Sequence, residues 1–565
     1  MTVSTRPHAP KVSRRRPEIA GEIPRIATGA DVREAVSTEI AREARDAIAR
    51  SGYAVGAHLL QRAAALTSDE RNREQLLLTA ADAFVRAGRA DDAAQLLDAP
   101  PLLNAANPDS TRVRARLARL QGRVGEAIDL LLDKGRTLAD TDPKLASRLL
   151  MDAAMAGQAV RDGRALAAAE RAVELGMGDP LPQLVLAATR VLVGRSLETA
   201  QARTLEHDAL DLIASLGTEV TDDIVYGPAL VLMDAGEHER ALRLINALVE
   251  CIRRSGAAAY LPDVLNARAI TLLGLGDWDV AVADLTEACR VSDELGQRFD
   301  EAASLAWLGR VQAARGEEDA CRNAIARARA EFVRLGVLSG GWLAACNKTI
   351  RLLELTVGRP EQVLANPIGP DDLRFAEDWI EAAIRLGRNE DAEAMLTAYE
   401  RCHISPSART MRAARCRALL AADDEFEDWF ERARDDAPAG FPFDQARNDL
   451  CLGERRRRAG RRIEARAPLE RAAGAFTRLG AGPWADRARR ELQATGARTR
   501  DSGTSADLTA QELAVARAVA AGATNKEAAA QLFLSAKTIE FHLRNAYAKL
   551  GIRSRSEIGQ RLADS

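Results

Sequence analysis

The sequence predicts a nearly all-α protein on three observations. Residues of the types AVILMFWYC make up 47% of the chain, but aromatic residues only 4%, and Ala and Leu dominate. Such a composition suits closely packed helices better than sheets, which favour β-branched and aromatic side chains. From about residue 31 to residue 493, apolar residues recur every three or four positions in short segments separated by glycine-containing breaks. The C-terminal segment 506–565 contains three helix-starting patterns of the form Ser/Thr-x-x-Glu.

Length, charge and motif content exclude several classes of protein. The 565 residues are too many for one hydrophobic core, so several domains or a repeat array are expected. The net charge of −3 argues against a chain-wide basic nucleic-acid binder. We find no uncharged apolar run long enough to span a bilayer and no apolar segment after the N-terminal arginines, so we expect no transmembrane helix and no secretory signal.

The sequence also lacks the common signatures of metal and nucleotide chemistry. The seven Cys are scattered without a Cys-x-x-Cys, and neither a His-Glu-x-x-His nor a Gly-x-x-x-x-Gly-Lys-Ser/Thr pattern occurs. We therefore expect each Cys to be a small buried apolar residue in a reducing cytoplasm. We also expect no bound metal, no cofactor and no enzymatic activity.

Residues 1–30 differ from the rest of the chain. They hold six Lys or Arg against two acidic residues and show little helical periodicity. We predict a disordered basic tail.

Residues 31–493 are predicted to form a helical repeat array that senses a signal or binds a partner. Gly236, Gly276, Gly316 and Gly358 recur at nearly equal intervals of about 40 residues. A period of this size built from two helices is typical of an α-solenoid, and the region resembles a tetratricopeptide-type array with long repeats. In six breaks an Ala stands five positions after a Gly: Gly88–Ala93, Gly122–Ala127, Gly236–Ala241, Gly276–Ala281, Gly387–Ala392 and Gly460–Ala465. We expect the Gly to end one helix in the left-handed conformation and the Ala to let the next helix cross its neighbour closely.

Two sets of side chains in this array have a functional and a purely structural interpretation. Large aromatic residues could contact a ligand or partner in a concave groove, or could fill gaps between Ala-rich helices: Tyr226, Tyr260, Trp278, Trp307 and Trp342. The basic run Arg455–Arg458, with Arg461 and Arg462, could be a solvated helix end, a contact to the DNA backbone, or a contact to an acidic face of the same chain.

Residues 494–506 are rich in Thr, Ser, Gly and Arg and are predicted to be a linker. Residues 507–565 are predicted to form four short helices. Capping boxes begin at Thr509, Thr524 and Ser554, Ser535 caps the third helix, and Gly522 and Gly551 end helices. Because the second and third helices are joined by only a few residues, they form a helix-turn-helix.

The third of these helices is predicted to have two unlike faces. Ile539, Leu543, Ala546, Tyr547 and Leu550 lie on one apolar face and should pack inward. The opposite face, predicted to read bases in the major groove, consists of Lys537, Glu540, Phe541 and Arg544. Phe541 suits a thymine methyl group, Arg544 a guanine and Glu540 a cytosine amino group. Residues at helix starts or flanks suit phosphate contacts: Lys526, Ser535, Thr538 and Lys549.

This segment resembles the LuxR-type (GerE/NarL-like) helix-turn-helix family. The resemblance implies that the third helix reads bases and that the fourth mediates dimerisation, here through Ser554, Ile558 and Leu562. Glu540 replaces a residue that is often basic in relatives, so the base preference does not carry over. The matching features are LTAQE at Leu508–Glu512, Gly522 with Thr524–Glu527, Leu534-Ser535, Lys537-Thr538-Ile539, His542-Leu543 and Lys549-Leu550-Gly551.

The array before it is similar to the corresponding region of the large ATP-binding LuxR regulators, most clearly in Gly460–Leu492. Those regulators begin with an ATPase domain, and no such domain, phospho-receiver or acyl-homoserine-lactone domain is recognisable in this sequence. The hypothesis is a cytoplasmic transcription regulator, associated with the nucleoid when bound to DNA. Its partners would be double-stranded DNA, a second copy of itself, an unidentified small-molecule or protein effector, and RNA polymerase as a possible further partner. The alternative is a helical-repeat interaction scaffold whose helix-turn-helix serves dimerisation.

Overall fold

The computed structural model describes residues 29–50, 52–103, 107–160, 162–176, 178–192, 204, 206–211, 226–337, 341–401, 406–437, 440–496, 508, 510–532, 536–552 and 554–563. All regular elements within these ranges are helices, as the composition predicts. None of these helices combines the length and the apolar character that a membrane span requires. The predicted tail at 1–30 and linker at 494–506 fall almost wholly outside the described residues.

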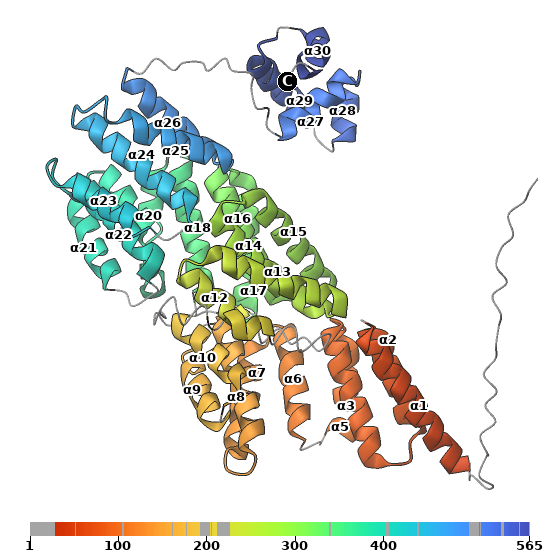
Figure 1. Ribbon diagram of the computed structural model, residues 1–565. Helices are drawn as coiled ribbons and strands as arrows, with labels where there is room; N and C mark the ends of the chain where they lie inside the picture. The colour runs from red at the N-terminus through yellow and green to blue at the C-terminus, as the bar shows by residue number, and fades with distance from the viewer. Residues whose placement is uncertain are drawn as a thin grey trace, which may run out of the picture.

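The helices form an array in three consecutive stretches, followed by a small C-terminal unit (Figure 1). The N-terminal stretch comprises α1 (Gly29–Ala49), α2 (Tyr53–Leu66), α3 (Glu70–Arg86), α4 (Ala90–Leu97), α5 (Pro100–Leu103), α6 (Pro108–Leu120), α7 (Val124–Leu138), α8 (Pro143–Val160), α9 (Ala165–Gly176) and α10 (Pro180–Leu192). The central stretch comprises α12 (Tyr226–Asp234), α13 (His238–Ser255), η2 (Ala258–Tyr260), α14 (Leu261–Leu275), α15 (Trp278–Glu294), α16 (Arg298–Arg315), α17 (Glu318–Arg334), α18 (Trp342–Thr356) and α19 (Pro360–Leu364).

The C-terminal stretch comprises η3 (Pro370–Phe375), α20 (Glu377–Arg385), α21 (Asn389–Glu400), α22 (Pro406–Leu420), α23 (Phe426–Asp435), α24 (Pro442–Arg458), α25 (Arg466–Arg478) and α26 (Gly482–Ala494). The C-terminal unit comprises α27 (Ala510–Ala520), α28 (Asn525–Gln531), α29 (Ala536–Leu550), η4 (Arg555–Glu557) and α30 (Ile558–Ala563).

Neighbouring helices of the array pack as hairpins, as in α7 with α8, α14 with α15 and α16 with α17. Six of the turns between consecutive helices follow the Gly-x-x-x-x-Ala pattern, among them the turn between α14 and α15. All six glycines of the pattern have a positive φ, between 73° and 96°. All six alanines of the pattern are at most 1% exposed, and each belongs to an apolar cluster of the array. The pattern therefore predicts both the turn and a buried alanine after it, and the helix-pair array is confirmed.

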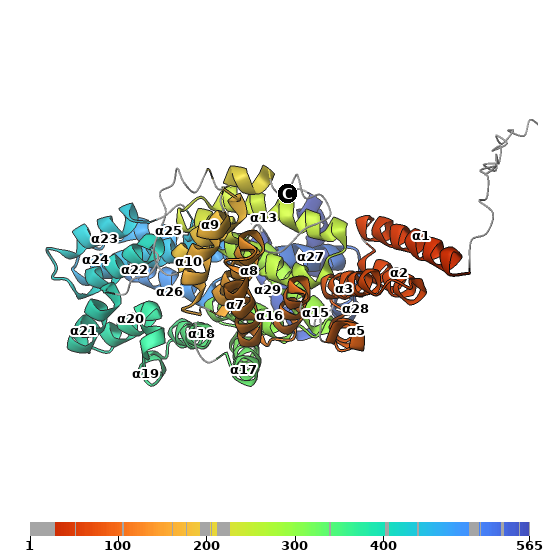
Figure 2. The ribbon, with the colours of Figure 1, turned by 90° about the horizontal axis from the view of Figure 1, so that it is seen from below.

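The three stretches do not form an open superhelix with a simple concave groove, because their hairpin ends touch. A Cβ atom at Gly88 would lie 2.7 Å from the side chain of Leu295, after α15, and one at Gly276 would lie 2.9 Å from Pro442, at the start of α24. The N-terminal stretch (red to gold) accordingly lies below the central stretch (green), and the C-terminal stretch (cyan to blue) lies beside it (Figure 1). Seen from below, the array extends from α1 at one end to α21 and α23 at the other (Figure 2).

Buried ion pairs join the helices of the C-terminal stretch. Arg447 on α24 donates to Asp378 on α20 over 2.6 Å, and Arg412 on α22 donates to Asp444 over 2.7 Å. Two arginines of the basic run at the end of α24 also form ion pairs within the chain: Arg456 contacts Glu427 at 2.6 Å and Arg457 contacts Glu491 at 2.5 Å. Of the three interpretations of this run, the contact to acidic residues of the same chain holds for these arginines.

Candidate nucleic-acid interface

The C-terminal unit has its own apolar core, which fixes the orientation of α29. Ile539, Leu543, Ala546 and Leu550 are 6% exposed or less, and Tyr547 packs beside them. They contact Val515 and other residues of α27, and α28 packs on α29 as well. The predicted apolar face of the third helix is therefore confirmed, and its opposite face is left to the solvent.

The helix starts in this unit are held by local hydrogen bonds. The Thr524 hydroxyl accepts from the Glu527 backbone N–H at 3.3 Å, and the Glu527 carboxylate accepts from the Thr524 N–H at 2.7 Å, which is the predicted capping box. Ser554 instead donates its hydroxyl to the Glu557 carboxylate, and the short turn η4 leads into α30. Thr509 lies outside the described residues.

The exposed face of α29 carries the four side chains predicted to read bases: Lys537, Glu540, Phe541 and Arg544. Phe541 is 51% exposed and is the one aromatic ring among the exposed large apolar side chains of the described residues. The Arg544 guanidinium lies 5.6 Å from the centre of its ring. In the part of the chain that the structure describes, Lys537, Glu540 and Arg544 form no ion pair, so all three remain available to a partner.

The residues predicted to contact phosphates are placed differently from one another. Lys526 is exposed in the first turn of α28, and Thr538 is half-buried in the first turn of α29. The Lys549 ammonium lies 2.5 Å from the Glu512 carboxylate on α27, so it already has a partner within the unit. Ser535 lies outside the described residues.

The predicted dimerisation helix is corrected at one position. Ile558 is fully buried in the core of its own unit, so its side chain cannot contact a second copy in this arrangement. Leu562 is partly buried against the same core, and Ser554 is half-exposed. The sequence pattern did not separate these roles because one apolar stripe on a six-residue helix serves a core and an interface equally well.

Three of the five aromatic residues predicted for the array line one cavity of about 450 Å³, which we call the central cavity: Trp278, Trp307 and Trp342. Tyr260 is corrected to a core residue, because it is 1% exposed in an apolar cluster with helices of the N-terminal stretch. Tyr226 begins α12, and its side chain lies outside the described residues. A smaller space of about 120 Å³ adjoins the central cavity and shares Gln158, Trp307 and Trp342 with it.

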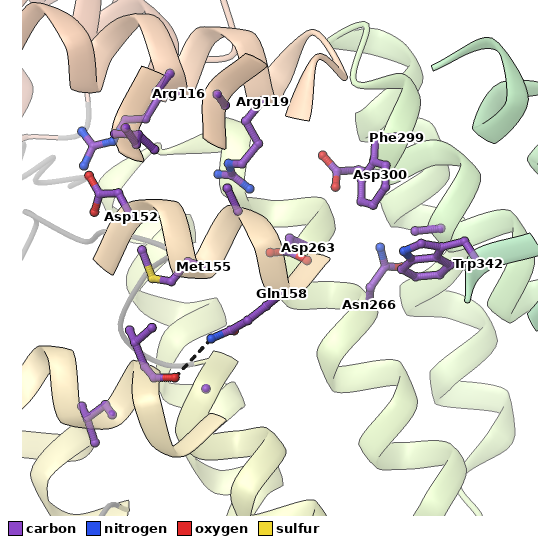
Figure 3. A pocket seen from close by; sticks show the side chains of 18 of the residues that line it. Arg116, Arg119, Asp152, Met155, Gln158, Asp263, Asn266, Phe299, Asp300 and Trp342 are labelled. Carbon is purple, nitrogen blue, oxygen red and sulfur yellow. Dashed lines mark hydrogen bonds between the residues drawn. The ribbon is translucent and has the colours of Figure 1, made fainter. Parts of the chain in front are cut away.

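Figure 3 looks into this smaller space, between α8 of the N-terminal stretch and α14 and α16 of the central stretch. Asp152 pairs with Arg112 at 2.7 Å. Gln158 donates to the backbone oxygen of Val185 at 3.2 Å and to the Thr189 hydroxyl at 2.7 Å.

Sequence reasoning missed the cations that line the central cavity: Arg310, Lys348, Arg374 and Arg412. A signal for Arg310 exists in hindsight. Arg310 is four positions from Ala306 and Ala314 and three from Trp307, so it shares a helix face with them, and Val311 follows it directly. A charged side chain on such an apolar face is unexpected. The sequence gives no such signal for Lys348, Arg374 or Arg412, because charged residues in helices are usually solvated.

The described residues contain no group of three or more His, Cys, Asp or Glu that could hold a metal ion. Burial raises the pKa of the Cys416 and Cys451 thiols to about 12, so both behave as apolar residues.

The C-terminal unit also matches known proteins. Residues 506–561 match the family described as bacterial regulatory proteins, luxR family (GerE). A nitrate/nitrite response regulator protein homolog of Haemophilus influenzae is 43% identical over 58 residues, which are 10% of this chain and 28% of that protein. The chain thus spans about a quarter of the length of this curated relative.

The array is similar at low scores to solved helical proteins. Yeast Tom70 is 10% identical, with 82% of this chain and 97% of that chain covered, at a TM-score of 0.33. The APC/C hetero-tetramer Cut9-Hcn1 is 12% identical, with 80% and 96% covered, at a TM-score of 0.25. The assignment of the array therefore depends on its own helix packing.

The helix-turn-helix geometry, the exposed face of α29 and the family match all fall within the same segment. Residues 506–561 of this chain form a LuxR-type helix-turn-helix domain.

Proposed function

We propose that the chain is a DNA-binding transcription regulator. The helix-turn-helix domain binds promoter DNA as a homodimer, and the helical array receives a signal from a small molecule or a partner protein. The chain itself is not an enzyme, acts in the cytoplasm, and influences RNA polymerase from its DNA site. The observation that supports this function best is the exposed face of α29, where Phe541 and three uncompensated polar side chains stand on a helix whose other face is buried.

The chemistry of that face suits the major groove. An exposed phenyl ring is unfavourable in water but contacts a thymine methyl group well, and a guanidinium pairs with the two acceptors of guanine. Each good base contact contributes roughly 1–3 kcal/mol of discrimination. Two copies would read half-sites about one helical turn, ~34 Å, apart.

The test is selection of binding sites from random DNA with the full-length protein and three variants. We expect Arg544→Ala to change the preferred sequence, because it removes a base contact. Lys526→Ala should weaken all sequences alike and reduce the salt dependence of binding, because it removes a phosphate contact. Arg334→Ala is the control, since Arg334 is an exposed arginine of the array.

An unchanged sequence preference in Arg544→Ala would contradict the assignment of α29 to the groove. Absence of any selected sequence with the wild-type protein would favour the interaction scaffold instead.

A further inference from the structure

The central cavity lies where helices from all three stretches of the array meet. Residues of α14, α16, α18, η3, α22 and the start of α24 line it, together with Gln158 of α8. Its volume of about 450 Å³ is within the range of ligand sites, roughly 300–1,000 Å³.

Most of the cavity wall is aromatic or aliphatic. Besides the three tryptophans, the rings of Phe375, Phe441 and Phe443 line it. Only 4% of the residues in the chain are aromatic, so the six aromatic rings that line the central cavity are a marked local enrichment. They offer flat apolar surfaces to the body of a bound molecule.

The backbone that places Phe441 is strained. Its φ of 56° is the one positive φ of a non-glycine residue in the described chain. Its N–H donates to the backbone oxygen of Gly274 at 2.6 Å, which ties the start of α24 to the end of α14. Backbone strain of this kind is costly and concentrates at active sites and ligand-binding sites.

The polar part of the wall carries more positive than negative charge. Lys348 pairs with Glu377 at 2.8 Å, and Arg412 pairs with Asp444 at 2.7 Å. Arg310 differs, because its Nη1 is buried without a hydrogen-bond acceptor among the described residues. Burial lowers the pKa of the Arg310 guanidinium, and the nearby charge of Arg412 lowers it further. Neighbouring carboxylates oppose this shift, but none of those described forms an ion pair with Arg310.

A cation with a buried, unpartnered nitrogen beside an aromatic cavity needs an anion. We propose that the central cavity binds a small organic monocarboxylate with an aromatic or aliphatic body, whose carboxylate pairs with Arg310. The planar fork of the Arg310 guanidinium fits the two oxygens of a carboxylate, whose negative charge would supply the acceptor that Arg310 lacks. The inference rests on the proposed function only in that this molecule would be the signal that the array receives.

The charges also argue against a phosphate ester as the ligand. Lys348 and Arg412 already donate to Glu377 and Asp444, so the second charge of a phosphate monoester would compete with two existing ion pairs. Phenyl phosphate therefore serves as the competing class in the test.

The experiment is isothermal titration of the full-length protein with 2-naphthoate, 2-naphthamide and phenyl phosphate. We expect naphthoate to bind with one molecule per chain, and the neutral amide and the phosphate to bind at least tenfold more weakly. Arg310→Gln should weaken naphthoate binding about ten- to a hundredfold, the effect of one charge-assisted hydrogen bond. Arg334→Gln, on the exposed surface of α17, should bind as the wild type does.

Equal affinity for naphthoate and naphthamide would overturn the proposal, as would unchanged binding by Arg310→Gln. Tighter binding of phenyl phosphate than of naphthoate would overturn the carboxylate assignment and would indicate a phosphate ligand instead. Circular dichroism of Arg310→Gln checks that the variant is folded, and Trp307→Ala gives a second variant that should weaken binding through the apolar wall.

This test is independent of the DNA experiment. Naphthoate binding without any DNA binding would leave the cavity assignment intact and refute the regulator. Specific DNA binding without naphthoate binding would refute only the cavity assignment.

Discussion

At the scale of single residues, the arginines in the interior of the array differ in whether a carboxylate neutralises them. Arg447 forms ion pairs with both Asp378 and Glu381, whereas Arg310 has no ion-pair partner among the described residues. Removing a paired guanidinium leaves buried carboxylates without a counter-charge. Removing an unpaired guanidinium instead removes a desolvation cost. Substitutions at the two sites should therefore change stability in opposite directions.

We predict that Arg310→Met raises the free energy of unfolding by about 1 kcal/mol in the absence of ligand, the size of other stabilising changes at functional sites. Arg447→Met should lower it by about 3–5 kcal/mol. Urea denaturation followed by circular dichroism measures both. A loss of stability in Arg310→Met comparable to that in Arg447→Met would show that Arg310 is a structural residue.

Lys348 gives the cavity a pH dependence. Burial, together with the nearby charges of Arg310 and Arg412, lowers the pKa of its ammonium to about 7, although the carboxylate of Glu377 opposes the shift. Below pH 7 the protonated ammonium adds positive charge to the cavity, and above pH 7 that charge is lost. The other charged or aromatic groups at the cavity near it are Arg374, Asp444 and Phe375.

We therefore predict that the affinity for 2-naphthoate falls as the pH rises from 6 to 8, by up to about tenfold per pH unit above 7. The ligand carboxylate stays ionised throughout this range. Titration calorimetry at several pH values measures the slope. In Lys348→Met the slope should be nearly flat, and an unchanged slope would show that Lys348 is not the group responsible.

The sequence predicts part of the lining of the central cavity. Tryptophans in an aromatic-poor chain are conspicuous, and three of the five aromatic candidates do line the cavity. Arg310, Lys348 and Arg412 could not be brought together from the sequence, because the three residues lie on three helices whose contact depends on long-range packing. On α29, in contrast, a single helix carries all four candidate residues, so helical periodicity alone placed them on one face.

At the scale of the elements, the glycine turns have two tasks. Each ends a helix, which the local pattern predicts, and several also contact a distant hairpin, which it cannot predict. Gly276 has a φ of 96°, and its missing side chain leaves room for Pro442, 2.9 Å from where a Cβ would lie. Gly358 has a φ of 80°, but nothing described lies within 4 Å of its Cβ position.

Comparing Gly358 with Gly276 separates the strain of the left-handed backbone from the packing contact with Pro442. We predict that Gly358→Ala lowers the free energy of unfolding by about 1–2 kcal/mol, the cost of a left-handed conformation for an L-residue. Gly276→Ala should cost about 1–3 kcal/mol more, because it also forces α24 away from α14. Chemical denaturation of the two variants measures the difference. Equal losses would show that the contact with Pro442 contributes nothing to stability.

At the scale of the whole molecule, the array and the helix-turn-helix domain have separate cores. The described residues that pack together in the C-terminal unit come from α27 to α30 and their connections, and none comes from the array. The sequence predicts this division because composition and helix signals change after residue 493. It predicts the shape of the array less well, because the contacts that close the array join hairpins far apart in the chain, such as Gly276 with Pro442 and Gly88 with Leu295.

Separate cores predict that residues 507–565 fold alone. We expect this fragment to be helical by circular dichroism and to bind the DNA sequence selected by the full-length protein. Its affinity should be lower, because so small a unit buries a limited core and lacks any contact that the array provides. A disordered fragment would show that the helix-turn-helix domain depends on the array.

The same fragment tests whether the cavity and the DNA site communicate. If a carboxylate in the central cavity is the signal, naphthoate must favour one arrangement of the array over another, and this preference must reach the DNA-binding domain through the chain. Coupling of this kind is typically about 1–3 kcal/mol, so we predict that saturating naphthoate changes the DNA affinity of the full-length protein by roughly 5- to 150-fold. Fluorescence anisotropy of labelled operator DNA measures the change.

Two controls show whether the change comes from the cavity. Naphthoate should leave the DNA affinity of the 507–565 fragment unchanged, because the fragment lacks the cavity. It should also leave the DNA affinity of full-length Arg310→Gln unchanged, because this variant lacks the guanidinium. A change of equal size in the fragment would mean that naphthoate acts on the DNA-binding domain directly, and no change in the full-length protein would leave the cavity as a binding site without a regulatory role.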